Sequence, residues 1–283
     1  MKKQKQKKLN ILIGWDSRED IAYEICKDSI ISTTQNQTNI TPIKQQELRK
    51  AGIYKREIDM LASTEFTFTR FLVPHLCNFQ GWALFCDCDF LFLEDVKNIF
   101  DLADDRYAVM VVKHDYKPKN RTKMDGQTQL PYPRKNWSSL ILWNCGHHKN
   151  KILTANKINE PSVDGAYLHR FQWLDDVEIG NISQEWNWLV NWYKEPKDGH
   201  PKALHFTEGG PWFKDYENCE YANKWFSAKS HYYEKKYTET HISLVELTNK
   251  RKQDQYKNKI DNLNVTNITV SYTHLTLPTK RIV

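Results

Sequence analysis

The sequence predicts an α/β fold with a mostly parallel central sheet flanked by helices. Short apolar runs bounded by turn residues recur along the chain and are typical of buried strands. Helical patterns separate several of these runs, and strands that alternate with helices favour a parallel sheet covered on both faces. The composition agrees, because 40% hydrophobic and 27% charged residues in a chain of 283 are ordinary for a globular protein with a sizeable core.

The chain opens with the first half of a strand–helix–strand unit. Residues 10–14 form an apolar run that ends at Gly14, the pattern of a buried strand entering a turn. Ser17 followed by Asp20 resembles a capping box, and an apolar stripe at helical spacing comes next: Ile21, Ala22 and Ile25. We therefore expect a strand, a short loop and a helix in that order.

A second helix is expected from residue 63 or 64 to Leu72. Phe68 and Phe71 supply its apolar stripe, and Pro74 is expected to kink or end it because proline has no backbone N–H to donate.

Further buried strands are expected downstream. Trp82–Cys86 is an apolar run that stops abruptly at an Asp-Cys-Asp sequence, and residues 108–112 and 139–143 have the same strand-like character.

The sequence predicts one main domain preceded by a tail. We expect a single domain at residues 10–228 and a basic tail at 1–9. Five lysines in the first eight residues supply five of the six net positive charges, so the remainder is near neutral and does not indicate a nucleic-acid partner. The tail is expected to be solvated, with contact to an anionic membrane or nucleic acid as the alternative.

Two further segments follow the expected domain. Residues 229–270 read as a polar, partly helical extension. Residues 271–283 resemble translated sequencing adapter, and we expect them to be non-native.

The sequence predicts a cytoplasmic protein without a transmembrane segment. No apolar stretch approaches the roughly 18 to 20 residues needed to span a bilayer, and the apolar run after the charged start is too short for a signal peptide. Six cysteines are scattered without a framework spacing, which suits a reducing compartment.

The two aspartates after the strand Trp82–Cys86 are the first candidate site. Asp87 and Asp89 share a face if the segment is extended, and the end of a strand is where open α/β sheets bind ligands. Carboxylates there are costly to desolvate unless a cation pairs with them, and Mn²⁺ or Mg²⁺ does this well. A solvated turn is the alternative, but the apolar runs on both sides disfavour it.

His205 is the second candidate. It lies in an apolar stretch that runs into Gly209 and Gly210, where backbone amides can approach a phosphate closely. Neutral imidazole is a competent third ligand for Mn²⁺, although a lone histidine is more often structural.

Six segments in chain order resemble the family 8 glycosyltransferases, the group that includes glycogenin and bacterial galactosyltransferases. They are distributed in order over roughly residues 10–228: N-I-L-I-G-W-D at 10–16, S-T-E-F-T-F-T-R-F-L-V-P at 63–74, A-L-F-C-D-C-D-F-L-F-L-E-D at 83–95, N-W-S-S-L-I-L-W-N at 136–144, I-S-Q-E-W-N-W at 182–188 and H-F-T-E-G-G-P-W at 205–212.

The resemblance implies a GT-A fold with a Rossmann-like nucleotide-binding half, and a hexosyltransferase-type enzyme that acts with retention. It implies a Mn²⁺ or Mg²⁺ ion, a UDP-sugar or similar nucleotide-sugar donor, and a glycan or other hydroxyl acceptor. It further implies metal ligation by Asp87, Asp89 and His205, and donor binding by Gly14, Asp16, Arg70, Asp87, Gly209 and Gly210.

Two departures from the family pattern matter. The closing motif of the family carries a Lys before Pro-Trp, where this chain has Gly210, so the candidates for the missing positive charge are Arg70, Lys202 and Lys214.

The D-Q-D sequence of the family is also not evident. The nearest carboxylates are Asp175 and Asp176, for which we hypothesise a catalytic role, and Asp164 is a weaker candidate; a solvated turn is the alternative.

Other functions stay open at this level. A non-catalytic relative that binds a nucleotide sugar or carbohydrate is the main alternative, and a phosphatase of the haloacid-dehalogenase type, which also carries Asp-x-Asp after a strand, is another. Four tryptophans either shape an acceptor site or belong to the core: Trp137, Trp143, Trp173 and Trp188.

Overall fold

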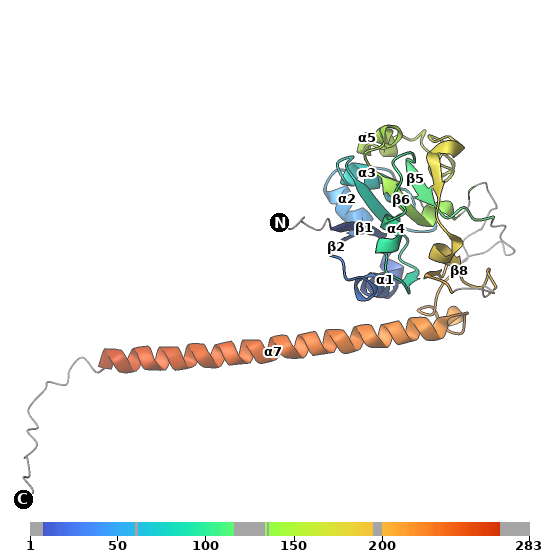
Figure 1. Cartoon of the computed structure of the whole chain (residues 1–283). Coiled ribbons are helices and arrows are strands. Elements are labelled where there is room, and N and C mark those ends of the chain that lie inside the picture. The colour runs from blue at the N-terminus through green and yellow to red at the C-terminus, as the bar shows by residue number, and fades with distance from the viewer. Residues whose placement is uncertain (1–7, 60–61, 116–133, 135, 195–199, 267–283) are drawn as a thin grey trace, which may run out of the picture. The chain divides into compact units, whose positions relative to one another are not determined.

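The computed structural model describes residues 8–59, 62–115, 134, 136–194 and 200–266 (Figure 1). The chain divides into two compact units, Met1–Ser230 and His231–Val283. The expected tail at 271–283 and all but the end of the basic tail lie outside the described residues, and the predicted domain boundaries stay predictions.

Among the described residues, the first unit is built on a six-stranded sheet with strand order β2-β1-β3-β6-β5-β7. Five strands run in one direction and β6 runs against both of its neighbours. The prediction of an α/β fold with a mostly parallel sheet is therefore confirmed. The strands are β1 Leu9–Gly14, β2 Thr38–Ile43, β3 Trp82–Cys86, β5 Val109–Val111, β6 Leu140–Asn144 and β7 Ile179–Asn181.

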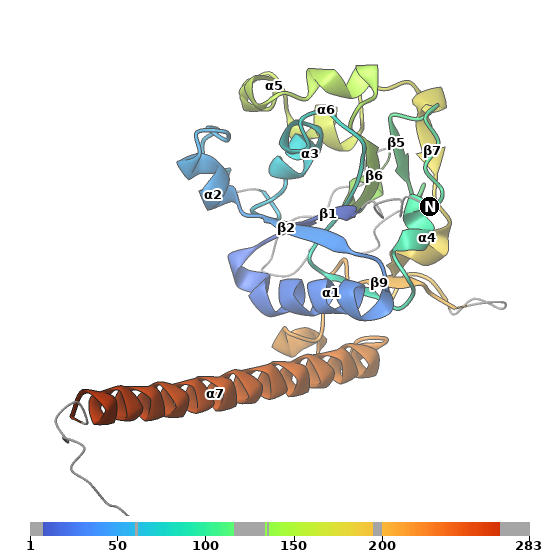
Figure 2. The ribbon, with the colours of Figure 1, turned by 60° about the vertical axis from the view of Figure 1, so that its left-hand side comes forward.

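Helices cover both faces of this sheet. Figure 2 shows α1 on one side of the strands, with α3 and α6 on the other. The central strands are buried on both faces, which explains their unbroken apolar runs. The α-helices of the first unit are α1 Asp20–Thr33, α2 Gln45–Lys50, α3 Val73–Leu76, α4 Lys97–Phe100, α5 Ala155–Asn159 and α6 Gly165–His169.

The first turn differs in detail from the prediction. The helix is entered through a 3₁₀ turn, η1 Ser17–Glu19, and Asp16 is its cap because its carboxylate accepts from the Arg18 backbone N–H. The capping box predicted at Ser17 is wrong, since the Ser17 hydroxyl donates to Glu65 instead. The local sequence did not distinguish Asp16 from Ser17 as the capping residue. The tertiary contacts of Glu65 with both side chains leave Asp16 as the cap.

The long helix predicted for residues 63–72 is also wrong. That segment forms turns and then a 3₁₀ helix, η2 Thr69–Leu72, which leads into the short helix α3. Pro74 lies in the first turn of α3, where its missing N–H costs no hydrogen bond, so it begins a helix instead of ending one.

A second, three-stranded sheet brings distant segments beside the end of β3. It has the order β4-β9-β8, with β4 Phe90–Phe92, β8 Trp188–Leu189 and β9 Ala203–His205. β4 and β9 pair antiparallel, and Phe90 is directly opposite His205. This register carries His205 to the aspartates that precede β4.

The remaining helices are short, except for one at the end of the described chain. The 3₁₀ helices are η4 Trp137–Ser139, η5 His148–Ile152, η6 Asp176–Glu178, η7 Gln184–Asn187 and η8 Lys214–Tyr216. Helix α7, Ala222–Thr266, covers residues 229–266 of the segment expected to be partly helical, and residues 267–270 lie outside the described residues. In the described part of the chain, no helix has an apolar stretch that could cross a bilayer. The cytoplasmic location stays a prediction.

Candidate metal centre and ligand pocket

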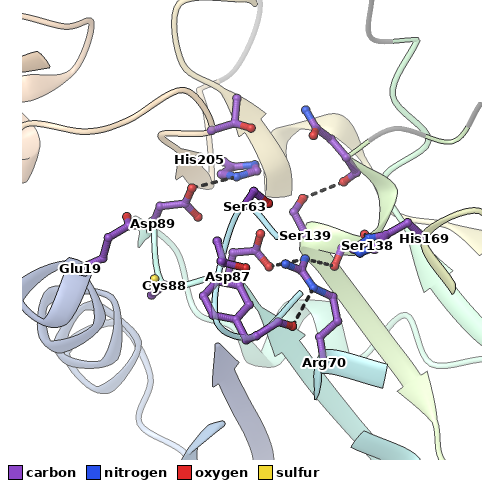
Figure 3. A pocket seen from close by; sticks show the side chains of 14 residues that line it. Glu19, Ser63, Arg70, Asp87, Cys88, Asp89, Ser138, Ser139, His169 and His205 are labelled. Atoms are coloured by element: carbon purple, nitrogen blue, oxygen red, sulfur yellow. Dashed lines mark hydrogen bonds and ion pairs between the residues drawn. The ribbon is translucent and has the colours of Figure 1, made fainter. Parts of the chain in front are cut away.

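Asp87, Asp89 and His205 converge at the edge of the central sheet. One ligand atom from each lies within 4.8 Å of the others, and His205 Nε2 is 3.3 Å from Asp89 Oδ2 (Figure 3). Ligand bonds to Mn²⁺ or Mg²⁺ are about 2.1 Å long, so atoms bound to one ion lie at most roughly 4.3 Å apart. The cluster needs only a small contraction to hold one divalent ion.

The donor set suits such an ion chemically. Two carboxylates supply the oxygen ligands that Mn²⁺ and Mg²⁺ prefer, and a neutral imidazole is a competent third ligand for a divalent metal. Asp87 follows β3 directly and Asp89 precedes β4, so both stand where the chain passes from the large sheet to the small one.

A buried amide fixes the histidine. His205 Nδ1 is 2.8 Å from Asn187 Oδ1, while Asn187 Nδ2 donates to Ser139 Oγ at 2.9 Å. Because the amide nitrogen is already used, its oxygen accepts from imidazole Nδ1–H, and the lone pair of Nε2 is left facing Asp89. Because Asn187 is fully buried, solvent does not compete with His205 and Ser139 for hydrogen bonds to its amide group. The imidazole has the tautomer that a metal ligand requires.

Arg70 holds the first aspartate. Its Nη1 donates to Asp87 Oδ1 at 2.7 Å and to the Ser138 carbonyl at 3.0 Å, and its guanidinium lies over the rings of Phe66 and Phe85. The side chain is only 5% exposed. An arginine gripped in this way fixes the position of the Asp87 carboxylate.

Among the three candidates for the missing charge, Arg70 is the one that lines the pocket. Lys202 Nζ instead pairs with Glu185 at 2.7 Å, and Lys214 is exposed at the start of η8.

The cluster forms one wall of a pocket of about 690 Å³, its open mouth included. Other walls present hydroxyl, amide and imidazole groups, which suit a ligand rich in oxygen atoms. They come from segments far apart in the sequence: Ser63, Thr64, Asn136, Ser138, His169 and Thr207.

Glu19 is a pocket residue that the sequence analysis missed. It is 2% exposed and lines the pocket with the two aspartates. Burial raises the pKa of Glu19 well above its ordinary value, and the negative charges of Asp89 and Asp16 raise it further. In the sequence, Glu19 belongs to a run of charged residues typical of a solvated turn, so no local signal marks it as buried.

Two donor-binding residues predicted near the first strand do not line the pocket. A Cβ at Gly14 would lie 2.4 Å from the Phe66 ring, so glycine is required there by close packing. Asp16 is fully buried and accepts four hydrogen bonds, three from Arg18 and one from the Glu65 backbone. Both residues shape the loop beside the pocket, and their direct contact with a donor stays a prediction.

The two glycines of the closing motif are likewise packed against aromatic rings. A Cβ at Gly209 would lie 2.9 Å from Tyr216, and one at Gly210 would lie 2.1 Å from Trp212. Gly209 also has φ +128°, a conformation that side chains disfavour. Neither lines the pocket, and diphosphate binding by them stays a prediction.

Asp175, Asp176 and Asp164, the carboxylates considered for catalysis, make local structural contacts. Asp175 and Glu178 form the capping box of η6, and Asp176 pairs with Arg134. The side chains of Asp175 and Asp176 are 81% and 83% exposed, respectively, and do not line the pocket. Asp164 caps α6 by accepting from Tyr167. The catalytic role of Asp175 and Asp176 stays a prediction that this geometry does not favour.

The four tryptophans belong to the core or its margin. Trp143 and Trp188 are buried, while Trp137 and Trp173 are partly buried and pack against the main core. None of the four lines the pocket.

The fold and the site define the class of the protein: it has the GT-A architecture of glycosyltransferases, with an Asp-Asp-His cluster at the sheet edge. The WbbM bifunctional glycosyltransferase has a TM-score of 0.51 at 14% identity, over 78% of this chain and 49% of that one. The apo form of the glycosyltransferase GlyE of Streptococcus pneumoniae TIGR4 has a TM-score of 0.54 at 14% identity, over 83% and 64%. The chain thus spans about half to two thirds of the length of these structures.

A comparison at the level of sequence places the chain in a family. It is 52% identical over 231 residues to Protein CDI of Arabidopsis thaliana, which covers 80% of this chain and 88% of that protein. The chain belongs to the family of Protein CDI. No family model matches it, and membership of glycosyltransferase family 8 stays a prediction.

Proposed function

We propose that the chain is a metal-dependent glycosyltransferase that moves a sugar from a nucleotide-sugar donor to a hydroxyl acceptor. The observation that carries the proposal is the convergence of Asp87, Asp89 and His205 in a pocket that Arg70 also lines. The GT-A fold shared with two glycosyltransferases supports it.

The residues of the pocket suit the chemistry of glycosyl transfer. Asp87, Asp89 and His205 would hold Mn²⁺ or Mg²⁺, which when bound supplies positive charge that offsets the charge developing on a departing diphosphate. Arg70 keeps Asp87 in place and adds a second positive charge in the same pocket.

Further pocket groups serve binding. Ser138 Oγ lies 2.7 Å from His169 Nδ1, and this pair lines the pocket, where its remaining hydrogen-bonding capacity suits sugar hydroxyls or phosphate oxygens. The resemblance to family 8 favours a UDP-sugar donor, a hexosyl group, and transfer with retention, which we include in the proposal.

The haloacid-dehalogenase alternative is disfavoured by the surroundings of Asp87. Arg70 donates to Asp87 Oδ1 at 2.7 Å, and such an ion pair lowers the nucleophilicity that a covalent mechanism would require of this carboxylate.

Donor hydrolysis tests the proposal. The full chain is incubated with Mn²⁺ and a panel of nucleotide sugars, and release of nucleotide is measured. We expect slow release with at least one donor, reduced at least 100-fold in Asp87→Ala and Asp89→Ala. Equal activity in these variants and wild type would refute the roles assigned to the two aspartates.

The same panel separates an enzyme from a binding protein. Calorimetry with each donor in the presence of Mn²⁺ measures binding directly. Binding of a donor with no release of nucleotide, on any acceptor tried, would favour the non-catalytic relative.

A further inference from the structure

Glu19 is a buried carboxyl with one oxygen that no described residue partners. Among the described residues, none donates a hydrogen bond to its Oε2 atom. The nearby Asp16 shows the contrast, because Arg18 and the Glu65 backbone donate four hydrogen bonds to its carboxylate. A carboxyl oxygen left unpartnered in the interior is costly, so a partner from outside the chain is the natural completion.

That carboxyl lies in the wall of the pocket that holds the metal cluster. Figure 3 shows Glu19 beside Asp89, on the far side of the pocket from Arg70. Arg70 forms its ion pair with Asp87, so the arginine of this pocket is engaged with the other aspartate. The Glu19 and Asp89 side therefore presents two acidic groups, and among the described residues that line the pocket no arginine or lysine other than Arg70 is present, so a divalent cation would complement this side.

Glu19 lies outside the set of direct ligands. The three residues whose ligand atoms fall within 4.8 Å of one another are Asp87, Asp89 and His205, without Glu19. Mg²⁺ and Mn²⁺ usually keep several water molecules, and polar groups beyond the ligands hold such waters in place. Glu19 has the position and the acceptor atom for this task.

We propose that Glu19 is a positioning residue of the cation site, whose carboxylate accepts a hydrogen bond from a water molecule bound to the divalent ion and whose charge strengthens ion binding. The inference rests on one part of the proposed function, the binding of a divalent cation, and does not depend on a donor sugar.

Binding of Mn²⁺ to the full, metal-free chain tests this inference. Free Mn²⁺ is followed by electron paramagnetic resonance in wild type, Glu19→Gln and Glu57→Gln. Glu19→Gln preserves shape and removes the charge, and we expect a dissociation constant about 10-fold to 100-fold higher, the usual effect of losing a group that supports metal ligands. Glu57, which is exposed, is the matched control, and its variant is expected to bind as wild type does.

Folding is checked by thermal unfolding without metal. Since Glu19→Gln removes a buried carboxyl oxygen that accepts no hydrogen bond from the described residues, its melting temperature is expected to equal or exceed that of wild type. If that variant does not fold, Glu19→Asp decides, because it withdraws the carboxylate by one methylene and is expected to weaken binding as well.

Two results are distinguished by Asp89→Asn. If wild type binds no Mn²⁺, or Asp89→Asn binds it equally well, the proposed metal site fails together with this inference. If Asp89→Asn loses binding while the folded Glu19 variant keeps the affinity of wild type, the inference about Glu19 alone is overturned.

Discussion

The imidazole of His205 is held 2.8 Å from the side-chain oxygen of Asn187, and that contact determines which of its nitrogens can bind a metal. Asn187 is fully buried and its amide nitrogen is bound to Ser139, so the amide cannot turn without breaking a second hydrogen bond. Hydrogen bonds from Ser139 through Asn187 to His205 therefore place the proton on Nδ1 and leave the Nε2 lone pair available to a metal ion.

The first prediction concerns the hydrogen bond between Asn187 and His205. Asn187→Leu removes the acceptor for His205 Nδ1–H, and we expect Mn²⁺ affinity to fall about 10-fold to 100-fold. Asn187→Asp keeps an acceptor at the same place and is expected to lose much less. Calorimetric titration of both variants checks the prediction, and equal losses in the two would show that the tautomer of His205 is not what Asn187 supplies.

The second prediction identifies the cation that replaces the lysine of the closing motif. Arg70→Met is expected to lower kcat/KM for the donor at least 100-fold, because the variant loses both a positive charge in the pocket and the group that fixes Asp87. Arg70→Lys should restore little of the lost kcat/KM, since the ammonium of the shorter lysine side chain does not reproduce the hydrogen bonds to both Asp87 and Ser138.

Lys202→Met is the matched control for Arg70, because Lys202 forms its ion pair with Glu185 outside the pocket. Its donor kinetics are expected to stay within about two-fold of wild type. A loss as large as that of Arg70→Met would move the missing charge to Lys202.

The third prediction is a dependence of stability on pH. Burial alone would raise the pKa of Asp16, but hydrogen bonds from Arg18 and the Glu65 backbone outweigh it and lower the pKa below its ordinary value of 3.8. A depressed folded-state pKa means that the unfolded chain binds more protons near that pH. The stabilisation is thus present above about 3.8 and is lost as the pH falls through the lower folded value.

Asp16→Asn tests that dependence. At pH 7 we expect the variant to be less stable by about 2–3 kcal/mol, the scale of hydrogen bonds to a charged group. Urea unfolding at a series of pH values should show the gap between wild type and variant narrowing below about pH 4. A gap that stays constant down to pH 3 would contradict the pKa assignment.

The fourth prediction separates packing from phosphate binding at Gly210. A Cβ there would lie 2.1 Å from Trp212, so Gly210→Ala is expected to destabilise the fold by about 1–3 kcal/mol, the usual cost of overpacking. Gly165→Ala in α6, whose Cβ would meet only His169 at 3.9 Å, should leave the melting temperature nearly unchanged. Loss of donor affinity in Gly210→Ala without loss of stability would favour a role at the diphosphate.

Much of the fold could be predicted from local pattern. The runs at Trp82–Cys86 and at the start of the chain are strands because a strand buried on both faces must be apolar throughout. The segment 63–72 could not be predicted in the same way. Its apolar residues are held by tertiary contacts in turns and a 3₁₀ helix, and periodicity does not distinguish these from an α-helix.

The sequence by itself determined the aspartate pair, since two carboxylates directly after a buried strand are placed at a sheet edge by the strand alone. It also nominated His205, but only the pairing of β4 with β9 decided that this side chain reaches Asp89 from 116 residues away.

The tertiary structure alone decided which other polar groups share the pocket. Glu19 and Asn187 are buried beside the cluster, whereas Asp175 and Asp176 are exposed. A residue's type and its neighbours in sequence fix its chemistry, but its burial and its partners depend on the segments that pack against it. For that reason the candidate ligands could be predicted from the sequence, whereas the groups that support them could not.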